Sequence, residues 1–286
     1  MDLAAWRGRT VIITGGNSGI GLEAARGLKA GGANVVLACR DVTRARAVSD
    51  GMAVRELDLA DLGSIAAFAE GTDTVDALIC NAGVMGGPLL GTVQGFERQM
   101  GTNHLGHAAL VARLFPLLDK ASGRVVMISS IAARGGNLTA QMNQDDLVSP
   151  VGYAPQVVYS NTKQANLLFA QELHRRVGAR VAAVAAHPGV SWTNLFLRQL
   201  KDEGRGYLAP AMRVLGPLVL QSARAGAQPT LRALLEPSGS FVGPRRFNQY
   251  RGPAELLEVY PTGSDPATAA RLWELTEQIL ELRLPS

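Results

Sequence analysis

Cysteine is scarce in this chain, where Cys39 and Cys80 are the only two thiols among 286 residues and stand without CxxC spacing. This scarcity excludes a disulfide-rich secreted scaffold and a cysteine zinc site, so both thiols are expected to be buried and reduced. Long apolar runs are also missing, since none reaches the roughly 18 residues of a membrane helix. The first nine residues lack the apolar core of a signal peptide. We expect a cytoplasmic protein without a membrane anchor.

Blocks of basic residues are absent as well, because no Lys/Arg run exceeds two residues although the formal net charge is +4. The sequence therefore gives no reason to expect a nucleic-acid partner. His104 and His107 lie one helical turn apart without an HExxH or Glu-x-x-His pattern, so no metal site is expected. The chain also lacks the GxSxG elbow of a hydrolase.

Continuous apolar runs rich in β-branched residues recur at residues 10–14, 34–38, 53–57, 75–80, 124–129 and 180–186. Continuous rather than alternating hydrophobicity predicts strands that are covered on both faces, as in a parallel sheet. Helical patterns lie between them, at 19–30, 43–49, 62–71, 101–118 and 158–177. This alternation predicts an α/β fold, a doubly wound parallel sheet of the Rossmann type, in a single domain over residues 1–286. A last strand at 240–242 and an amphipathic helix at 266–282 would complete it.

The segment from Val190 to Ser222 fits neither a plain strand nor one long helix. It mixes Trp192, Phe196 and Met212 with glycines and prolines. A long irregular segment of this kind predicts a cover over a substrate pocket, and the alternative is a surface helical insertion.

A glycine-rich turn follows the first predicted strand, with the sequence Thr14-Gly15-Gly16-Asn17-Ser18-Gly19-Ile20-Gly21. A strand, a glycine turn and a helix in succession place backbone N–H groups and a helix N-terminus at a pyrophosphate. The turn therefore predicts a dinucleotide site, although glycines can also serve strand-to-helix packing alone.

The end of the second predicted strand bears on the choice of cofactor. There an acidic residue would bind a ribose 2′-hydroxyl, and an arginine would accept a 2′-phosphate. Arg40 comes first and predicts NADP, because a guanidinium binds phosphate in a bidentate fashion. Asp41 supports the alternative of NAD if the strand ends one residue later, since its carboxylate would repel the phosphate.

Tyr159 and Lys163 are four residues apart, which places them on one face of a helix. A nearby ammonium favours the phenolate, so we expect the pKa of Tyr159 to be lowered from its usual value near 10. Such a phenol suits proton transfer at neutral pH. Ser130, upstream, would donate a hydrogen bond to the substrate oxygen. The alternative is an ordinary exposed pair on a helix.

The glycine turn, Asn81-Ala82-Gly83, Ser130, Tyr159 and Lys163 occur here in the order typical of the short-chain dehydrogenase/reductase superfamily. The chain resembles that family over nearly its whole length. It is most similar to the retinol dehydrogenase and protochlorophyllide reductase-like branch, on the segments Cys39-Arg40-Asp41, Asp58-Leu59, Tyr159-Ser160-Asn161-Thr162-Lys163 and His187-Pro188-Gly189 with Thr193.

The resemblance implies roles for individual residues. Asn103 would hold a water for proton relay to Lys163, unless it is only a polar residue at a helix start. Lys163 would also bind the nicotinamide ribose, and Asp58 and Leu59 would lie near the adenine. The implied cofactor contacts are Gly15, Asn17, Ser18, Gly19, Ile20, Gly21, Arg40, Asp58, Leu59, Asn81, Ala82, Gly83, Tyr159, Lys163, Pro188, Gly189 and Thr193.

The expected function is an NADP-dependent oxidoreductase that transfers hydride between nicotinamide and the carbonyl or alcohol of an apolar small molecule. The alternatives are an NAD-dependent dehydrogenase, a non-catalytic NADP-binding regulatory protein and a sugar-nucleotide epimerase. Ser130 and Tyr159 are 29 positions apart, which leaves an extra loop at 134–156. Family members with such an insertion can lose the helical face that builds tetramers. A monomer or homodimer is therefore expected, with a tetramer as the alternative.

Overall fold

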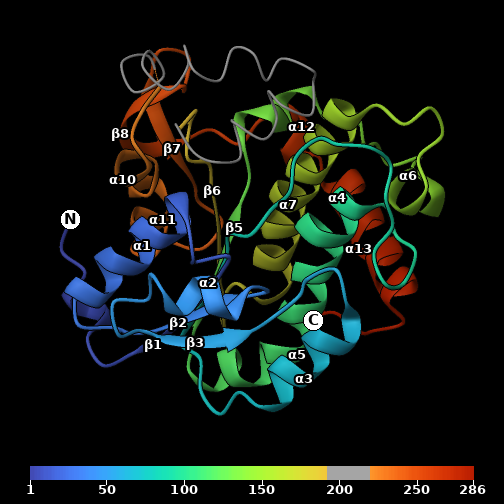
Figure 1. Cartoon of the computed structure of the whole chain (residues 1–286). Helices are drawn as coiled ribbons and strands as arrows, with labels where there is room; N and C mark the ends of the chain where they lie inside the picture. The colour runs from blue at the N-terminus through green and yellow to red at the C-terminus, as the bar shows by residue number, and fades with distance from the viewer. Residues whose placement is uncertain (192–219) are drawn as a thin grey trace.

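The computed structural model of the chain describes residues 1–191 and 220–286 (Figure 1). Within these ranges the strands form one sheet of order β3-β2-β1-β4-β5-β6-β7-β8, parallel except for the last pair. The strands are β1 (Thr10–Thr14), β2 (Asn34–Cys39), β3 (Ala53–Glu56), β4 (Ala77–Cys80), β5 (Arg124–Ile128), β6 (Ala182–Ala186), β7 (Phe241–Arg246) and β8 (Arg251–Leu257). The strand order reverses between β1 and β4, which creates a crevice at the carboxyl ends of these strands.

Helices cover both faces of the sheet (Figure 1). One face carries α3 (Leu62–Glu70), α5 (Gly106–Lys120), α7 (Pro155–Val177) and α13 (Pro266–Leu280), and the other carries α1 (Gly19–Ala30) and α11 (Gln228–Ala233). The shorter elements are α2 (Val42–Arg46), α4 (Arg98–Met100), α6 (Gln144–Val148), α10 (Ala223–Gly226), α12 (Pro261–Ser264), two 3-10 turns (Ala4–Trp6 and Ile131–Gly135) and a π-helical turn (Gly101–Leu105).

Strand β1 shows why its sequence is apolar throughout. Ile12 belongs to the core beneath α5 and α7, whereas Val11 and Ile13 belong to the core beneath α1. All three side chains are at most 1% exposed. Successive side chains of a strand point to opposite faces, so two covered faces need an unbroken apolar run. The doubly wound fold predicted from these runs is confirmed.

The six parallel strands of the first 186 residues lie within two residues of the predicted ranges. Helix α7 begins at Pro155, three residues earlier than predicted, because proline at the first helical position already has helical φ and lacks only an N–H that would find no intrahelical partner. Strand β8 was not predicted. It is an antiparallel strand that pairs with β7 alone, and it contains Pro253, which edge strands tolerate. Helix α6, inside the loop predicted at 134–156, was also missed although Asn143 and Asp146 form a capping box at its start.

Helix α13 lies along α7, which it covers on the side away from the sheet (Figure 1). Trp273 of α13 stacks on Phe169 of α7 with ring centroids 5.1 Å apart, and both are 1% exposed. His104 Nε2 lies 3.2 Å from Thr276 Oγ1, which links α13 to the π-helical turn. None of the helices in the two described ranges is long and apolar enough to cross a membrane.

Candidate active site

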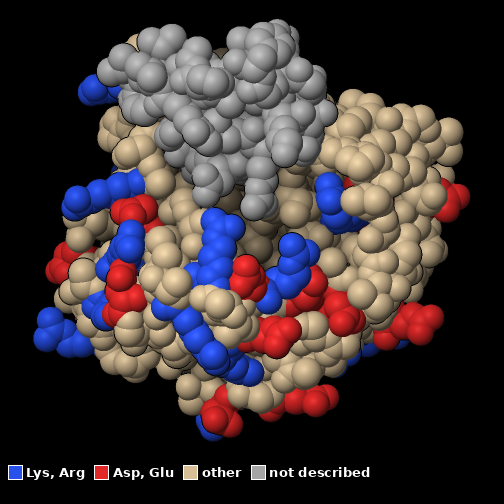
Figure 2. Space-filling model, viewed as in Figure 1, with Lys and Arg blue, Asp and Glu red and all other residues tan. Residues whose placement is uncertain are grey.

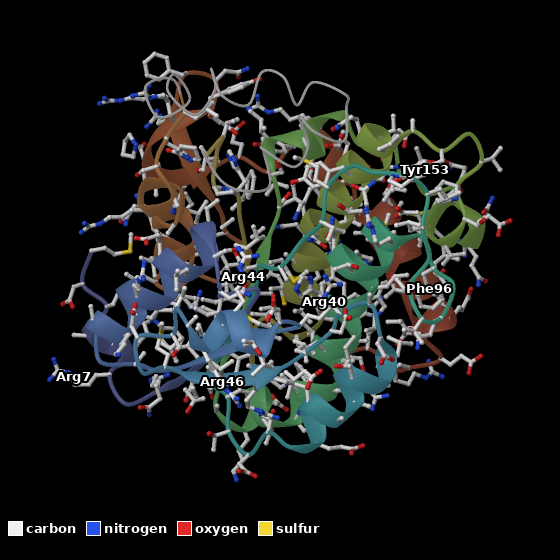
Figure 3. The ribbon with its side chains drawn as sticks, viewed as in Figure 1. Arg7, Arg40, Arg44, Arg46, Phe96 and Tyr153 are labelled. Atoms are coloured by element: carbon white, nitrogen blue, oxygen red, sulfur yellow. The ribbon has the colours of Figure 1, made fainter. Side chains whose placement is uncertain are left out.

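The predicted site residues that the structure describes gather at the carboxyl ends of β1, β2, β4, β5 and β6. Figure 2 shows the surface hollowed near the centre of the same view, with Lys and Arg side chains at its rim. Figure 3 labels Arg40 and Arg44 in that central region and Arg7 at the far left edge. Thr193 and most of the cover predicted at 190–222 lie outside the described residues.

The glycine turn has the backbone that its sequence predicts. Gly15 and Gly19 have φ values of +64° and +54°, in the left-handed region that favours glycine. A Cβ on Gly21 would collide with the side chain of Asn81, whose Nδ2 donates to the Thr14 carbonyl at 2.8 Å. Ser18 occupies the N-cap of α1 without a side-chain capping bond. The turn is thus held against the end of β4, and the first N–H groups of α1 are free of a capping side chain.

Strand β2 ends at Cys39, one residue beyond the predicted end. This is the condition under which Asp41 was expected to oppose a 2′-phosphate. However, Asp41 is the N-cap of α2, and its Oδ1 accepts from the Arg44 N–H at 2.8 Å. The Arg40 side chain is 76% exposed, and its Nη1 lies 3.9 Å from Asp58 Oδ2. The carboxylate of Asp41 therefore caps α2, while the guanidinium of Arg40 is exposed to solvent at the end of β2.

Asp58 and Leu59 follow β3 beside the same end of the sheet. Asp58 Oδ1 accepts from the Ala60 N–H at 2.9 Å, and Leu59 is 5% exposed. The Leu59 carbonyl packs so closely on Gly106 that a Cβ there would collide with it. The start of α5 is therefore seated directly on the segment after β3.

Ser130, Tyr159 and Lys163 come together where β5 ends and α7 passes beneath it. The Ser129 hydroxyl donates to the Lys163 carbonyl at 2.7 Å, which joins the strand end to the helix. Ser130 hydrogen-bonds the Tyr159 side chain, and the Lys163 Nζ lies 5.7 Å from the centroid of the Tyr159 ring. Tyr159 is 9% exposed and Lys163 4%. The structure thus brings the predicted serine, phenol and ammonium together, with Tyr159 and Lys163 buried and Ser130 half-buried.

The protonation of this group differs from the expectation drawn from the sequence. Burial raises the pKa of Tyr159 to about 12, although the hydrogen bond to Ser130 acts in the opposite direction. Burial also lowers the pKa of Lys163 to about 8. The expected lowering of the phenol pKa by Lys163 is wrong for this geometry, because desolvation disfavours both charged forms. In addition, the Lys163 Nζ donates to the Ile128 carbonyl at 3.1 Å.

Asn103 lies in the π-helical turn and not at a helix N-cap. Its Oδ1 accepts from the Val84 N–H at 2.7 Å, and its Nδ2 donates to the Val84 carbonyl at 2.8 Å. A Cβ on Gly83 would lie 3.3 Å from Asn103 Oδ1 and 3.6 Å from Lys163 Nζ. Asn103, Gly83 and Lys163 are therefore neighbours, as the resemblance implies. The water-holding role of Asn103 stays a prediction.

Pro188 and Gly189 follow β6 and contact the β7–β8 hairpin. Gly189 has a φ of +68°, and a Cβ there would lie 2.5 Å from the Tyr250 carbonyl. The Pro188 carbonyl accepts from Gln221 Nε2. Tyr250 was not singled out from the sequence, because its role depends on β8, which the sequence did not predict.

In the part of the chain that the structure describes, no group of three or more His, Cys, Asp or Glu side chains is placed to hold a metal ion. His104 and His107 point to different partners. His104 lies against Asn166 and Thr276, whereas His107 lies against Thr14 and the Asn103 carbonyl.

A crevice at a topological switch point, a dinucleotide turn and a buried tyrosine–lysine pair define a nicotinamide-dependent oxidoreductase. The model of the short chain dehydrogenase family matches residues 9–142. Human Retinol dehydrogenase 12 is 37% identical over 291 residues, covering 96% of this chain and 87% of that protein. Dehydrogenase/reductase SDR family member 13 of Bos taurus is 36% identical, covering 98% and 75%.

Solved structures agree with these sequence relatives. The crystal structure of an uncharacterized protein from Mycobacterium paratuberculosis matches with a TM-score of 0.81 at 40% identity, over 100% of this chain and 99% of that one. The chain belongs to the short-chain dehydrogenase/reductase family, in its retinol dehydrogenase-like branch.

Proposed function

We propose that this oxidoreductase uses NADP and interconverts the carbonyl and alcohol forms of an apolar small molecule. The observation that carries the choice of NADP is the pair Arg40 and Asp41. The Arg40 guanidinium is exposed at the end of β2, and the Asp41 carboxylate is occupied at the N-terminus of α2. A 2′-phosphate placed at this strand end would meet a cation and not an unpaired carboxylate.

The residues around the crevice fit a dinucleotide. In the glycine turn, a Cβ on Gly21 would collide with Asn81, so only glycine fits there. The Ser18 side chain does not cap α1, so the first N–H groups of this helix have no capping side chain. These groups would hold the pyrophosphate. Arg40 would hold the 2′-phosphate and Asp58 and Leu59 would border the adenine. Lys163 would hold the nicotinamide ribose, and Pro188 and Gly189 would border the carboxamide.

When bound, the cofactor would supply or accept the hydride. Tyr159 would give its phenolic proton to the substrate oxygen during reduction and accept a proton during oxidation. Ser130, which bonds the Tyr159 side chain, would also donate to the substrate oxygen and stabilise the charge that develops there. The Lys163 Nζ lies 5.7 Å from the centroid of the Tyr159 ring, and its charge would offset part of the cost that burial imposes on the phenolate.

The apolar substrate is supported by the relatives, which carry the name retinol dehydrogenase. A regulatory protein without catalysis would not need Ser130 beside a buried Tyr159 and Lys163. An NAD-dependent dehydrogenase is the second candidate, since β2 ends where that reading requires. The cytoplasmic location stays a prediction.

Two substitutions test the proposal. Tyr159→Phe removes only the hydroxyl, so binding of NADPH should change less than threefold while turnover of an aldehyde and ketone panel is lost. Unchanged turnover would reject the acid assigned here. For the cofactor, Arg40→Ala should weaken NADPH at least tenfold and NADH less than twofold in a fluorescence titration. Arg7→Ala is the matched control, because Arg7 is an exposed arginine at the left edge of the view, away from Arg40 at its centre (Figure 3). An equal loss of affinity for NADPH and NADH in Arg40→Ala would contradict the role of Arg40 at the 2′-phosphate and favour NAD.

A further inference from the structure

The segment Asn81–Val84 after β4 is held at both of its ends. The Thr14 Oγ1 accepts from the N–H groups of Asn81 and Ala82, each at 2.9 Å. Two residues further on, Asn103 bonds the N–H and the carbonyl of Val84. Thr14 belongs to β1 and Asn103 to the π-helical turn, so two separate elements fix this short segment.

His107 bonds both of these elements. Its Nε2 lies 2.8 Å from the Thr14 Oγ1, and its Nδ1 lies 2.9 Å from the Asn103 carbonyl. The hydrogen bonds therefore close into a ring that runs through Thr14, the Asn81–Val84 segment, Asn103 and His107. Both His107 and Asn103 are fully buried.

The hydrogen-bonding capacity of Thr14 fixes the tautomer of His107. The Thr14 oxygen already accepts two bonds, so its own hydrogen must be donated. The nearer acceptor is His107 Nε2 at 2.8 Å, because the Ile79 carbonyl is 3.4 Å away. Nδ1 then carries the imidazole proton and donates to the Asn103 carbonyl. Burial lowers the pKa of His107 to about 3, which keeps the ring neutral under physiological conditions.

The ring lies directly against the catalytic lysine. Gly83 belongs to the Asn81–Val84 segment of the ring, and a Cβ on it would be 3.6 Å from Lys163 Nζ. A shift of Asn81–Val84 would therefore change the packing of this segment against the Lys163 ammonium. The ring meets the glycine turn through Thr14 and through Asn81, whose Nδ2 donates to the Thr14 carbonyl at 2.8 Å without using His107.

We propose that His107 is a positioning residue, which closes this ring and so sets the Asn81–Val84 segment against Lys163. The inference rests on the proposed function, because it assigns the ring a role in turnover. The hydrogen bonds of His107 go to Thr14 and to the Asn103 carbonyl, so its effect would pass through these residues and the segment they hold. Loss of the ring should reduce kcat more than it weakens the cofactor.

The central experiment compares His107→Phe with Leu110→Ala. Leu110 is a fully buried residue of α5, one turn further along, that makes no hydrogen bond through its side chain. Both variants are assayed at a temperature where circular dichroism shows them folded. We expect His107→Phe to lower kcat about 10- to 100-fold, the scale of a small displacement in an active site, with the Kd for NADPH changed less than threefold. Leu110→Ala should keep kcat within twofold.

A conservative variant separates hydrogen bonding from packing. His107→Asn retains a donor at the place of Nδ1, so it should recover part of kcat by restoring the bond to the Asn103 carbonyl. Failure of His107→Asn to exceed His107→Phe, or equal kcat values for His107→Phe and Leu110→Ala, would overturn the positioning role.

Two measurements judge the ring apart from catalysis. Nitrogen-15 spectra of the wild type should show His107 as the Nδ1-protonated neutral tautomer that does not titrate between pH 5 and pH 8; an Nε2-protonated or titrating ring would overturn the inference. Thr14→Val and His107→Phe should be strongly non-additive in unfolding experiments, because each breaks the same ring. A wild type without NADPH-dependent turnover would instead refute the proposed function, and these two readouts would still decide whether the ring exists.

Discussion

Replacing Lys163 by methionine should make the protein more stable at neutral pH while abolishing its activity. Lys163 is 4% exposed, and burial lowers its pKa from 10.5 to about 8. Since its folded pKa is below its unfolded pKa, the lysine destabilises the folded state. This penalty is fully present below pH 8 and disappears as the pH rises from 8 to 10.5.

The size of the effect follows from the same pKa values. At about 1.4 kcal/mol for each pKa unit, the penalty is about 3 kcal/mol at pH 7 and falls below about 1 kcal/mol at pH 10. Lys163→Met also removes the bond from Nζ to the Ile128 carbonyl, worth about 1 kcal/mol. That carbonyl still accepts from Asn166 Nδ2 at 3.1 Å, so it is not left without a partner. The net gain at pH 7 is about 2 kcal/mol.

Urea unfolding of wild type and Lys163→Met at pH 7 and pH 10, without cofactor, measures this difference. The variant should be more stable at pH 7 and equal to wild type at pH 10. Titration of Tyr159 does not enter the comparison, because both proteins contain it. Lys120→Met, at the exposed end of α5, is the control and should change neither value. A variant that is less stable than wild type at pH 7, or a gain that does not depend on pH, would refute the reasoning.

Three further outcomes are expected. Burial lowers the pKa of His104 to about 4 and that of His107 and His187 to about 3. Because the unfolded chain takes up protons on these histidines below pH 6.5 and the folded chain does not, the free energy of unfolding in urea should fall by about 3 to 4 kcal/mol between pH 6 and pH 5. A free energy that does not change over this range would contradict the expectation. Trp273→Ala should cost about 3 to 5 kcal/mol, since the buried stack on Phe169 is lost; a cost below about 1 kcal/mol would show that α13 does not depend on it. Helix α13 covers α7, and we expect it to block the helical face that would build tetramers. Light scattering should therefore give the 30.2 kDa of one chain, and a tetramer mass would show that α13 does not block that face.

The sheet could be predicted from the sequence because burial on both faces demands unbroken apolar runs. The same rule failed for β8, which lies at the edge of the sheet, where one neighbour and alternating exposure relax that demand. Asp41 illustrates a second limit. Its position after β2 was visible in the sequence, but whether its carboxylate faces a phosphate or caps α2 depends on the local backbone.

The grouping of Ser130, Tyr159 and Lys163 could be predicted from the sequence, whereas the pKa shifts of the phenol and the ammonium could not. The spacing of Tyr159 and Lys163 places both on one face of α7, as expected. The direction of the phenol pKa depends on how much water the fold removes and on where the ammonium points, and neither can be read from spacing. His107 was considered only as a metal ligand. Its position four residues after Asn103 was the available signal, since residues at that spacing share a helical face.

The burial that opposes ionisation of Tyr159 and Lys163 also bears on how the proposed reaction should depend on pH. A phenol with a pKa of about 12 holds its proton across the neutral range. It is therefore ready to give that proton to an oxygen that becomes strongly basic as hydride arrives, which is the reductive direction. Oxidation of an alcohol needs the phenolate first, and the positive charge of an oxidised nicotinamide together with Lys163 would have to offset the cost of burial. We therefore expect the rate of reduction to change little across the neutral range, and the rate of alcohol oxidation to rise with pH.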